Sequence, residues 1–365
     1  MCKVATPFNI KNLKIKNRIL RSATMENLAD CEGFVTDELV KLYYDLAVGQ
    51  SGLIVSGAAA VEPIGRCWPR QIAVWDDKFI DGLRQIVQVI HHYGQDSKCA
   101  LQLHHGGMGG YGFSYGQKKN NWCMNKASDD EILASIYSFA EAARRAKTAG
   151  FDAVAIHAGH GYLISQFLSP AINKRTDRWG GSLQKRMRFA LEICLKVRES
   201  VGNEIPILWK MNCADYLAEG QGVEAYAEIA GTLVAEGIDL IELSGGLKDQ
   251  MRLRQELKQK AGPQEAYFRE AIVPFQKAIG DKCLAVTGGI RSLEVMEELL
   301  AQGVHFIGLS RPLICEPNLP GRLLDTPDKR QSKCTSCNRC LPRIAKQSLK
   351  CVAFDDLQKI INNLS

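Results

Sequence analysis

The chain lacks the features that place a protein in a membrane or send it out of the cell. No apolar run among its 365 residues is long enough to span a bilayer. The first residues contain no apolar signal core, so the sequence predicts a cytoplasmic protein without membrane contact. A large excess of charge is also missing. The formal net charge of +6 is spread along the chain, which argues against nucleic acid as a partner and suits an anionic ligand.

Cysteine, in contrast, is plentiful, but its distribution argues against disulfides. The chain has 13 cysteines, 46% hydrophobic residues and 24% charged residues, a composition typical of an ordinary globular protein. Nine of the cysteines are scattered singly through apparent helices and strands, which indicates free thiols in a reducing compartment. The other four lie close together towards the C-terminus: Cys334, Cys337, Cys340 and Cys351.

Apolar runs bounded by turn residues recur eight times, with amphipathic segments between them. They predict strands over 19–24, 52–58, 99–103, 153–157, 207–212, 240–244, 284–287 and 306–310. The segments 76–92 and 128–149 predict two of the helices between them. The second opens with a capping box, from Ser128 to Glu131, and stops at Gly150, a suitable C-cap.

Eight β-then-α units in one chain of this length indicate a (β/α)8 barrel, the TIM-barrel fold of the α/β class. A doubly wound open sheet is the alternative, and eight consecutive units make it the weaker one. The barrel is expected over residues 1–325. Residues 326–365 are expected to form a short C-terminal extension that contains the clustered cysteines.

Two imidazoles and a phenol follow the fourth predicted strand within six residues. His157, His160 and Tyr162 are separated by glycines, which let the backbone turn tightly. A strand buried in a parallel sheet rarely ends in polar aromatic residues for packing reasons. Any one of the three would be interpreted as an ordinary loop residue. The three together favour hydrogen bonding to a substrate and proton transfer.

The other strand ends also carry polar residues and glycines, and barrels of this type bind ligands at those ends. They comprise Ser22, Ala23, Thr24, Ala58, Gln102, His104, His105, Lys210, Asn212, Ser244, Gly245, Gly246, Gly288, Gly289, Ser310 and Arg311. The glycines after the last two strands suit a phosphate group bound by backbone N–H groups. Arg311 would add a bidentate contact to that phosphate.

One further motif is set aside. Residues 107–112 match a dinucleotide fingerprint and follow a predicted strand, but no apolar helix follows them. We interpret 107–119 instead as a glycine-aromatic loop over the mouth of the barrel, suited to act as a substrate lid.

Several passages of the chain resemble the old yellow enzyme family of flavin-dependent oxidoreductases. They are Asn17-Arg18-Ile19, Ser22-Ala23-Thr24, Leu101-Gln102-Leu103-His104-His105-Gly106-Gly107, His157-Ala158-Gly159-His160-Gly161-Tyr162, Phe167-Leu168-Ser169-Pro170, Asn173-Lys174-Arg175-Thr176-Asp177-Arg178-Trp179-Gly180-Gly181-Ser182 and Arg186-Met187-Arg188-Phe189. The resemblance covers about residues 5–325. It implies a barrel that holds FMN, is reduced by NADH or NADPH, and passes hydride to a substrate.

The resemblance implies a role for each strand-end residue. The redox-active edge of the flavin would be bordered by Ser22, Ala23, Thr24 and Ala58. Gln102 would pair with the pyrimidine edge. Lys210, where many family members carry arginine, would stabilise the reduced, anionic ring from beside N1 and the C2 carbonyl. The ribityl phosphate would be bound by Gly288, Gly289, Ser310 and Arg311.

The same resemblance implies an ene reductase that acts on activated alkenes. His157 and His160 would donate hydrogen bonds to a carbonyl, carboxylate or nitro oxygen, so that a conjugated C=C bond accepts hydride. Tyr162 would protonate the adjacent carbon, since a phenol with an ordinary pKa of about 10 is protonated at neutral pH. Trp179 replaces a frequent tyrosine of the family and is interpreted as a structural substitution.

The clustered cysteines resemble the iron–sulfur segment that follows the barrel in the 2,4-dienoyl-CoA reductase and trimethylamine dehydrogenase branch. Cys334, Cys337 and Cys340, with Cys351 later, would ligate a [4Fe–4S] cluster, although the third cysteine comes one residue early. A zinc ion bound by four thiolates and unligated thiols are the alternatives. Relatives in that branch continue into FAD- and NADH-binding domains, so a cluster here would need an electron-donating partner protein or would be a retained structural element.

That branch also carries a catalytic histidine after strand six, and residues 245–254 contain none. A dienoyl-CoA reaction is therefore doubtful, and simple ene reduction is favoured. The same loop carries five basic residues, which are interpreted as a solvated helix face, with an anionic substrate or the 2′-phosphate of NADPH as the alternative: Lys248, Arg252, Arg254, Lys258 and Lys260.

Other functions stay open from the sequence alone. The chain could be a flavin and iron–sulfur electron-transfer subunit, or a 2-enoate or dienoyl-type reductase that works with a partner. Oxidative C–N cleavage is a further reaction of such barrels. A different class is a lyase in which Lys210 forms a Schiff base. The sequence leaves a homo-oligomer open as well.

Overall fold

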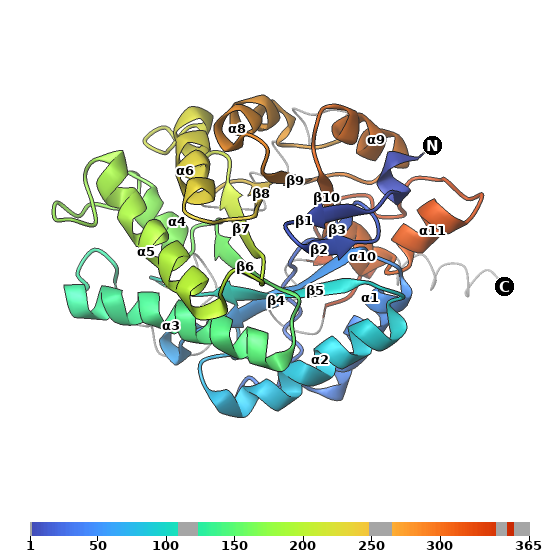
Figure 1. Ribbon diagram of the computed structural model, residues 1–365, viewed down its shortest axis with the longest axis horizontal. Helices are drawn as coiled ribbons and strands as arrows, with labels where there is room; N and C mark the ends of the chain where they lie inside the picture. The colour runs from blue at the N-terminus through green and yellow to red at the C-terminus, as the bar shows by residue number, and fades with distance from the viewer. Residues whose placement is uncertain (1, 109–122, 248–264, 341–348, 354–365) are drawn as a thin grey trace.

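The computed structural model describes residues 2–108, 123–247, 265–340 and 349–353. Its centre is a closed barrel of eight parallel strands surrounded by helices, in the order β10-β3-β4-β5-β6-β7-β8-β9 (Figure 1). The strands are β3 (Ile19–Arg21), β4 (Leu53–Ala60), β5 (Lys98–His104), β6 (Ala153–Ala158), β7 (Ile207–Asn212), β8 (Leu240–Ser244), β9 (Cys283–Thr287) and β10 (Phe306–Leu309). The predicted (β/α)8 barrel is confirmed, and the open sheet is excluded.

Most strand boundaries agree with the prediction, and the exceptions have local causes. β3 ends at Arg21 rather than at residue 24, and just beyond it Thr24 Oγ1 donates to Ser22 O (3.0 Å). β4 runs two residues further than predicted, past a register shift between Val55 and Ala58. A bulge of this kind re-aims the side chains beyond it.

The helices cover the outside of the barrel. They are α1 (Asp37–Val48), α2 (Ile80–Tyr93), α3 (Asp129–Ala149), α4 (Leu163–Leu168), α5 (Leu183–Val201), α6 (Val223–Ala235), α8 (Ile272–Ile279), α9 (Leu293–Ala301), α10 (Arg311–Cys315) and α11 (Leu319–Asp325). Short 3-10 turns lie at η1 (Lys3–Ala5), η2 (Pro63–Gly65), η3 (Asp77–Phe79) and η4 (Arg269–Ala271). No helix among the described residues is long and apolar enough to cross a membrane.

The residues predicted to cap the two ends of α3 do so. Ser128 and Glu131 form a complete capping box, and Gly150 ends the helix in the left-handed conformation (φ +96°). The predicted helix 76–92 differs at its start. Asp76 caps the 3-10 turn η3, and the α-helix begins only at Ile80.

An N-terminal hairpin closes the bottom of the barrel. Strands β1 (Phe8–Ile10) and β2 (Leu13–Ile15) pair antiparallel. Ile10 and Ile15 are fully buried against the lower barrel interior, which comprises Leu20, Leu53, Val55, Ala100, Ala153, Ala155, Leu208, Leu240, Cys283, Ala285 and Phe306. Because apolar side chains fill this end of the barrel, the polar side chains gather at the other end.

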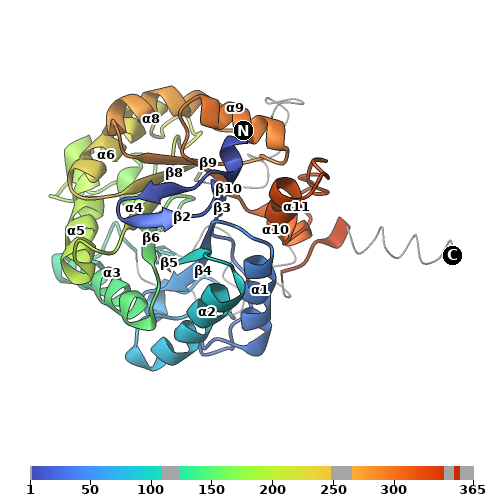
Figure 2. The same cartoon turned by 45° about the vertical axis from the view of Figure 1, so that its right-hand side comes forward.

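The chain beyond the barrel packs against its side. In Figure 2, α10 and α11 lie beside α1, and Gly321 N in α11 donates to Gly49 O (3.1 Å). Ser332 N donates to Arg291 O (3.0 Å), which fixes the segment that leads to the first clustered cysteine. The division into a barrel over 1–325 and an extension over 326–365 stays a prediction.

Candidate active site

Aromatic and imidazole rings cluster at the carboxyl end of the barrel. The ring centroid of His157, near the end of β6, lies 5.0 Å from that of Tyr162 and 5.1 Å from that of His160. The ring of His104, the last residue of β5, lies 4.5 Å from the ring of Tyr162. Trp68 closes one side, 5.9 Å from Tyr162. The three residues that the sequence singled out therefore lie together, with a third imidazole and an indole beside them.

His160 is held in a backbone conformation that few non-glycine residues adopt. Its φ is +63°, and its N–H donates to Asn212 Oδ1 (2.9 Å). Its Nε2 lies 2.6 Å from Ser244 Oγ at the end of β8. The next residue must be glycine, because a Cβ at Gly161 would lie 2.6 Å from Leu247 O.

His104 presents a hydrogen-bond donor without a partner. The amide orientation of Gln71 is set because its Oε1 accepts from Cys67 N (2.8 Å). Gln71 Nε2 therefore donates to His104 Nδ1 (3.1 Å), which leaves the imidazole proton on Nε2. That Nε2 is buried and has no partner in the described part of the chain. A donor of this kind is expected to serve a ligand.

The two buried imidazoles are neutral at physiological pH. Burial lowers the pKa of His104 to about 3, and the neighbouring His105 adds to this effect. Burial also lowers the pKa of His157 well below its ordinary value, assisted by His160, His104 and Lys210. A neutral imidazole donates one hydrogen bond without bringing a charge, so the cluster would bind a substrate oxygen by hydrogen bonding and not by ion pairing.

The buried His104 predicts an acid-sensitive fold. Because the pKa of His104 is lowered in the folded state, its contribution to the free energy of unfolding is complete above about pH 6.5. This contribution is lost as the pH falls towards 3. At pH 5 the loss is about 2 kcal/mol. Between pH 7.5 and pH 5, we expect the free energy of unfolding to fall by about 2 kcal/mol less in His104→Gln than in the native chain, as measured by urea unfolding. The exposed His92 supplies the control, and equal losses in His92→Gln and His104→Gln would contradict the assignment.

A buried ion pair lies beside the rings, level with His157 in the strand register. Lys210 Nζ on β7 lies 2.9 Å from Glu242 Oε1 on β8 and donates to Ser22 Oγ (2.5 Å). Ser22 Oγ in turn donates to Glu242 Oε1 (2.5 Å). Glu242 was missed in the sequence analysis. The sequence does contain a sign of its role, because Glu242 is the single carboxylate in the apolar run 240–243. A carboxylate in a buried strand is rare unless it is paired.

Gln102 supplies a second buried donor without a partner. Its backbone N–H is fixed by Ser56 Oγ (2.9 Å), while its side-chain Nε2 is buried and without a partner in the described part of the chain. A buried amide left in this state costs about 1–3 kcal/mol. Ala58, on the adjacent β4, is paired in register with Gln102. A ligand that offers acceptor atoms between Gln102 and Lys210 fits this part of the barrel.

The predicted phosphate-binding residues lie at one side of the mouth. Gly288 and Gly289 have φ values of +106° and +77°, and a Cβ at Gly289 would lie 2.3 Å from the ring of Tyr267. The guanidinium carbon of Arg311 lies 5.9 Å from the centroid of that ring. Thr24 Oγ1 and Ser310 Oγ are 2.7 Å apart, which joins the loop after β3 to the end of β10. Backbone N–H groups, hydroxyls and an arginine are the groups that bind a phosphate.

The clustered cysteines surround a cavity of about 130 Å³ next to α10. Its lining includes all four predicted ligands together with a fifth thiol, Cys315. Burial raises the pKa of Cys315, and its contact with Cys351 adds to the rise. Arg311 Nη1 donates to Asn338 Oδ1 from the wall of the same cavity, so one arginine lies between the phosphate-binding residues and the cysteines.

The spacing of these thiols does not suit a single ion in the present geometry. Four thiolates around one zinc ion lie about 3.8 Å apart. Among the described residues, no three of the clustered thiols have sulfur atoms within 4.8 Å of one another. A cubane cluster holds its thiolates farther apart than one ion does.

Trp179 is buried and donates from Nε1 to Asp129 Oδ1 (2.6 Å) at the start of α3. It therefore packs outside the ring cluster, as expected of a structural substitution. The predicted lid, apart from residues 107 and 108, and the basic segment 248–260 lie outside the described residues.

The fold and these side chains define a class: barrel oxidoreductases that bind a phosphate-bearing organic cofactor at the carboxyl ends of the strands. The chain belongs to the NADH:flavin oxidoreductase / NADH oxidase family, whose model matches residues 3–328. Membership of this family implies an oxidoreductase that binds FMN. The resemblance to the old yellow enzyme family is confirmed.

Individual relatives agree with this assignment. The chain is 32% identical over 342 residues to an NADH oxidase from Thermoanaerobacter brockii, covering 90% of this chain and 52% of that protein. It is 34% identical over 326 residues to an NADPH dehydrogenase from Geobacillus sp., covering 86% and 92%. A solved structure of a 2-naphthoyl-CoA reductase superposes with a TM-score of 0.83 at 26% identity, covering 96% of this chain and 56% of that one. The chain thus spans about half the length of two of these three proteins.

Proposed function

We propose that the protein is an FMN-dependent NAD(P)H ene reductase that reduces activated C=C bonds in small molecules. The observation that carries the proposal is the ring cluster of His157, His160 and Tyr162 at the barrel mouth, with the buried Lys210 on the strand next to His157. Two imidazole donors and a phenol are the groups needed to hold an electron-withdrawing oxygen and to deliver one proton beside it.

The chain's own residues would have separate roles in the proposed reaction. When bound, FMN supplies the hydride that it has taken from NAD(P)H. His157 and His160 hold the substrate oxygen and draw electron density from the conjugated double bond. Tyr162 holds a proton at its hydroxyl for the carbon next to the activating group. His104 Nε2 adds a third donor, which suits a substrate with a second acceptor atom.

The buried polar residues of the barrel would hold and tune the cofactor. Gln102 would use its unpaired amide towards the pyrimidine edge, bordered by the loop after β3 and by Ala58. Lys210 would stabilise negative charge near N1, and Glu242 would moderate that effect by neutralising part of the ammonium charge. Arg311 has donors beyond the one it gives to Asn338, and with Ser310, Gly288 and Gly289 it would bind the phosphate.

The lyase alternative has less support. A Schiff base requires an amine that is free to attack, whereas Lys210 Nζ already contacts the carboxylate of Glu242 at 2.9 Å and donates to Ser22 Oγ. The same contact explains how a lysine can be buried at this position.

We further propose that Cys334, Cys337, Cys340 and Cys351 ligate a [4Fe–4S] cluster. The cavity that all four of them line supports a metal centre at this place. Electrons would then pass between the cluster and the flavin, with an electron-donating partner protein or further domains as their source. The arginine shared by both sites, Arg311, supports such a link.

A visible spectrum of anaerobically purified protein, combined with iron analysis, tests both proposals. We expect flavin absorbance that is bleached by NADH or NADPH and restored by an enone, an enoate or a nitroalkene. Protein that stays colourless after supplementation with FMN would overturn the reductase proposal. A flavin spectrum without iron would overturn only the cluster.

A further inference from the structure

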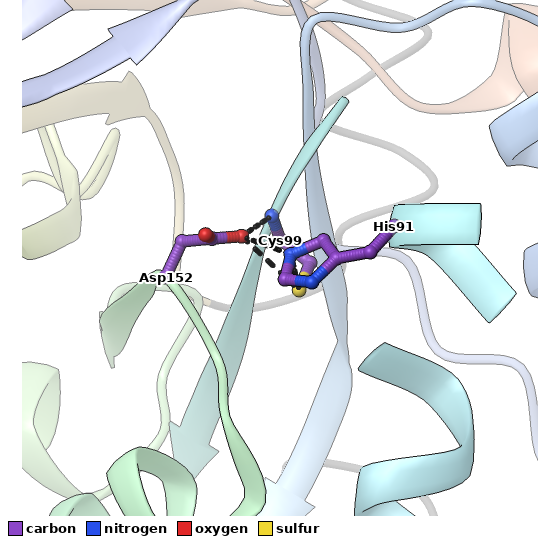
Figure 3. A group of neighbouring side chains, drawn as sticks. All are labelled: His91, Cys99 and Asp152. Carbon is purple, nitrogen blue, oxygen red and sulfur yellow. Dashed lines mark hydrogen bonds and ion pairs between the residues drawn. The ribbon is translucent and has the colours of Figure 1, made fainter. Parts of the chain in front are cut away.

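Three potential metal ligands converge at the end of the barrel opposite the flavin site. His91 lies in the last turn of α2, Cys99 near the start of β5, and Asp152 directly before β6 (Figure 3). His104 and His157 lie five residues further along β5 and β6. At the rise of an extended strand this separation is about 17 Å, so the two sites are independent.

The two distances from Cys99 Sγ match the coordination geometry of one metal ion, whereas the nitrogen–oxygen distance is that of a hydrogen bond. Cys99 Sγ lies 3.8 Å from His91 Nε2 and 3.5 Å from Asp152 Oδ2, and the nitrogen and oxygen are 2.8 Å apart. Tetrahedral Zn²⁺ with one thiolate, one imidazole and one carboxylate requires about 3.6, 3.6 and 3.4 Å. A point about 2.1 Å from all three atoms exists with shifts of only a few tenths of an ångström. No other group of this kind occurs within the described residues.

The surroundings of the three atoms also suit a divalent cation. Asp152 Oδ2 is held by the N–H of Cys99 (2.8 Å), so the carboxylate is oriented before any ion arrives. The other oxygen, Oδ1, faces Lys98 Nζ at 4.0 Å. A divalent ion with one thiolate and one carboxylate forms a neutral unit, which reduces the cost of burial around Cys99.

The backbone contact alone does not account for all three side chains. A carboxylate that accepts from Cys99 N and pairs with His91 Nε2 (2.8 Å) needs no thiol on the same oxygen as well. The side chain of His91 is 39% exposed and that of Asp152 is 14% exposed, so an ion can enter from solvent between them. His92, the next residue, packs instead against the ring of Tyr93 (4.5 Å) and contributes nothing to the cluster.

We propose that His91, Cys99 and Asp152 form a binding site for a divalent transition-metal ion, with Zn²⁺ as the best match and water as the fourth ligand. Binding releases the thiol proton of Cys99 to solvent, and His91 coordinates through Nε2 with its proton on Nδ1. The ion connects α2, β5 and the segment before β6 at the amino-terminal face of the barrel, which serves stability rather than catalysis in barrels of this type. The site therefore stabilises the fold.

Zinc binding to the full-length flavoprotein tests this site. After incubation with Zn²⁺ and gel filtration, the native chain is expected to hold one more equivalent of zinc than His91→Gln and Cys99→Ser. Saturating Zn²⁺ is expected to raise the midpoint of thermal unfolding by about 5 °C in the native chain. The loss of one ligand is expected to weaken binding roughly 100-fold, because even groups that only orient a ligand contribute 10- to 100-fold.

Two controls separate this site from the clustered cysteines and from a nonspecific effect. His92→Gln changes the neighbouring exposed histidine and is expected to keep the full zinc content and thermal shift. Cys337→Ser changes the other thiol site and is expected to keep the thermal shift. Since His91 is exposed, His91→Gln should fold even if Cys99→Ser does not. Equal zinc content in the native chain and His91→Gln would overturn the proposal.

Discussion

Replacing Tyr162 by phenylalanine is expected to slow the reduction of weakly activated alkenes at least about 100-fold, with flavin reduction by NAD(P)H changed less than twofold. The phenol supplies the proton only in the step that consumes the alkene. The aromatic ring, which packs 4.5 Å from His104 and 5.0 Å from His157, is kept in the variant. Strongly activated nitroalkenes should lose less, because they accept hydride without simultaneous protonation.

Stopped-flow measurement of the two half-reactions separates these effects. The rate at which NAD(P)H bleaches the flavin reports on the first, and the rate at which an enone or enoate restores the colour reports on the second. Tyr137→Phe is the matched control, because Tyr137 is 54% exposed on α3 and is not part of the ring cluster. Equal recovery rates in Tyr162→Phe and the native protein would remove Tyr162 from the proton-donor role.

Replacing Cys337 by serine is expected to remove the iron–sulfur cluster and to leave the flavin in place. Cys337 is exposed at the edge of the 130 Å³ cavity, so the change should not disturb the barrel core. With one of four thiolates gone, iron is expected to fall from about four atoms per chain to nearly none. Electron transfer between the flavin and a one-electron acceptor should fall more than tenfold.

Iron analysis, electron paramagnetic resonance of the reduced protein and flavin absorbance measure these outcomes together. Cys31→Ser is the matched control, because Cys31 is also an exposed free cysteine but lies outside the cavity. Iron retained in Cys337→Ser, or iron absent from the native protein purified without oxygen, would contradict the ligand assignment. Loss of flavin along with iron would instead show that the cavity wall supports the barrel.

The barrel was predictable because each of its parts has a local signal. Strands buried on both faces appear as short apolar runs, and β7 and β8 agree with their predicted ranges at both ends. The capping box and the left-handed Gly150 delimit α3 in the same way. Boundaries failed where tertiary contacts decide them, as at Arg21, where the chain leaves the strand so that Ser22 can reach Glu242.

The ring cluster was only partly predictable. His157, His160 and Tyr162 share one short passage, so their proximity follows from the sequence. His104 and Trp68 come from other segments, and their role depends on the closing of the barrel. The partner of Lys210 was missed for the same reason, because Glu242 lies one strand away and is adjacent only through the sheet register.

The sequence by itself determined the eightfold repeat, the strand ends that carry polar residues and the family to which the chain belongs. These are properties of neighbouring residues, so they can be recognised without coordinates. Only the tertiary structure decided which side chains share a buried volume: the tautomer of His104, the Lys210–Glu242 pair, and the convergence of His91, Cys99 and Asp152. Each depends on residues from separate elements, and the closing of the barrel alone fixes the distances between them.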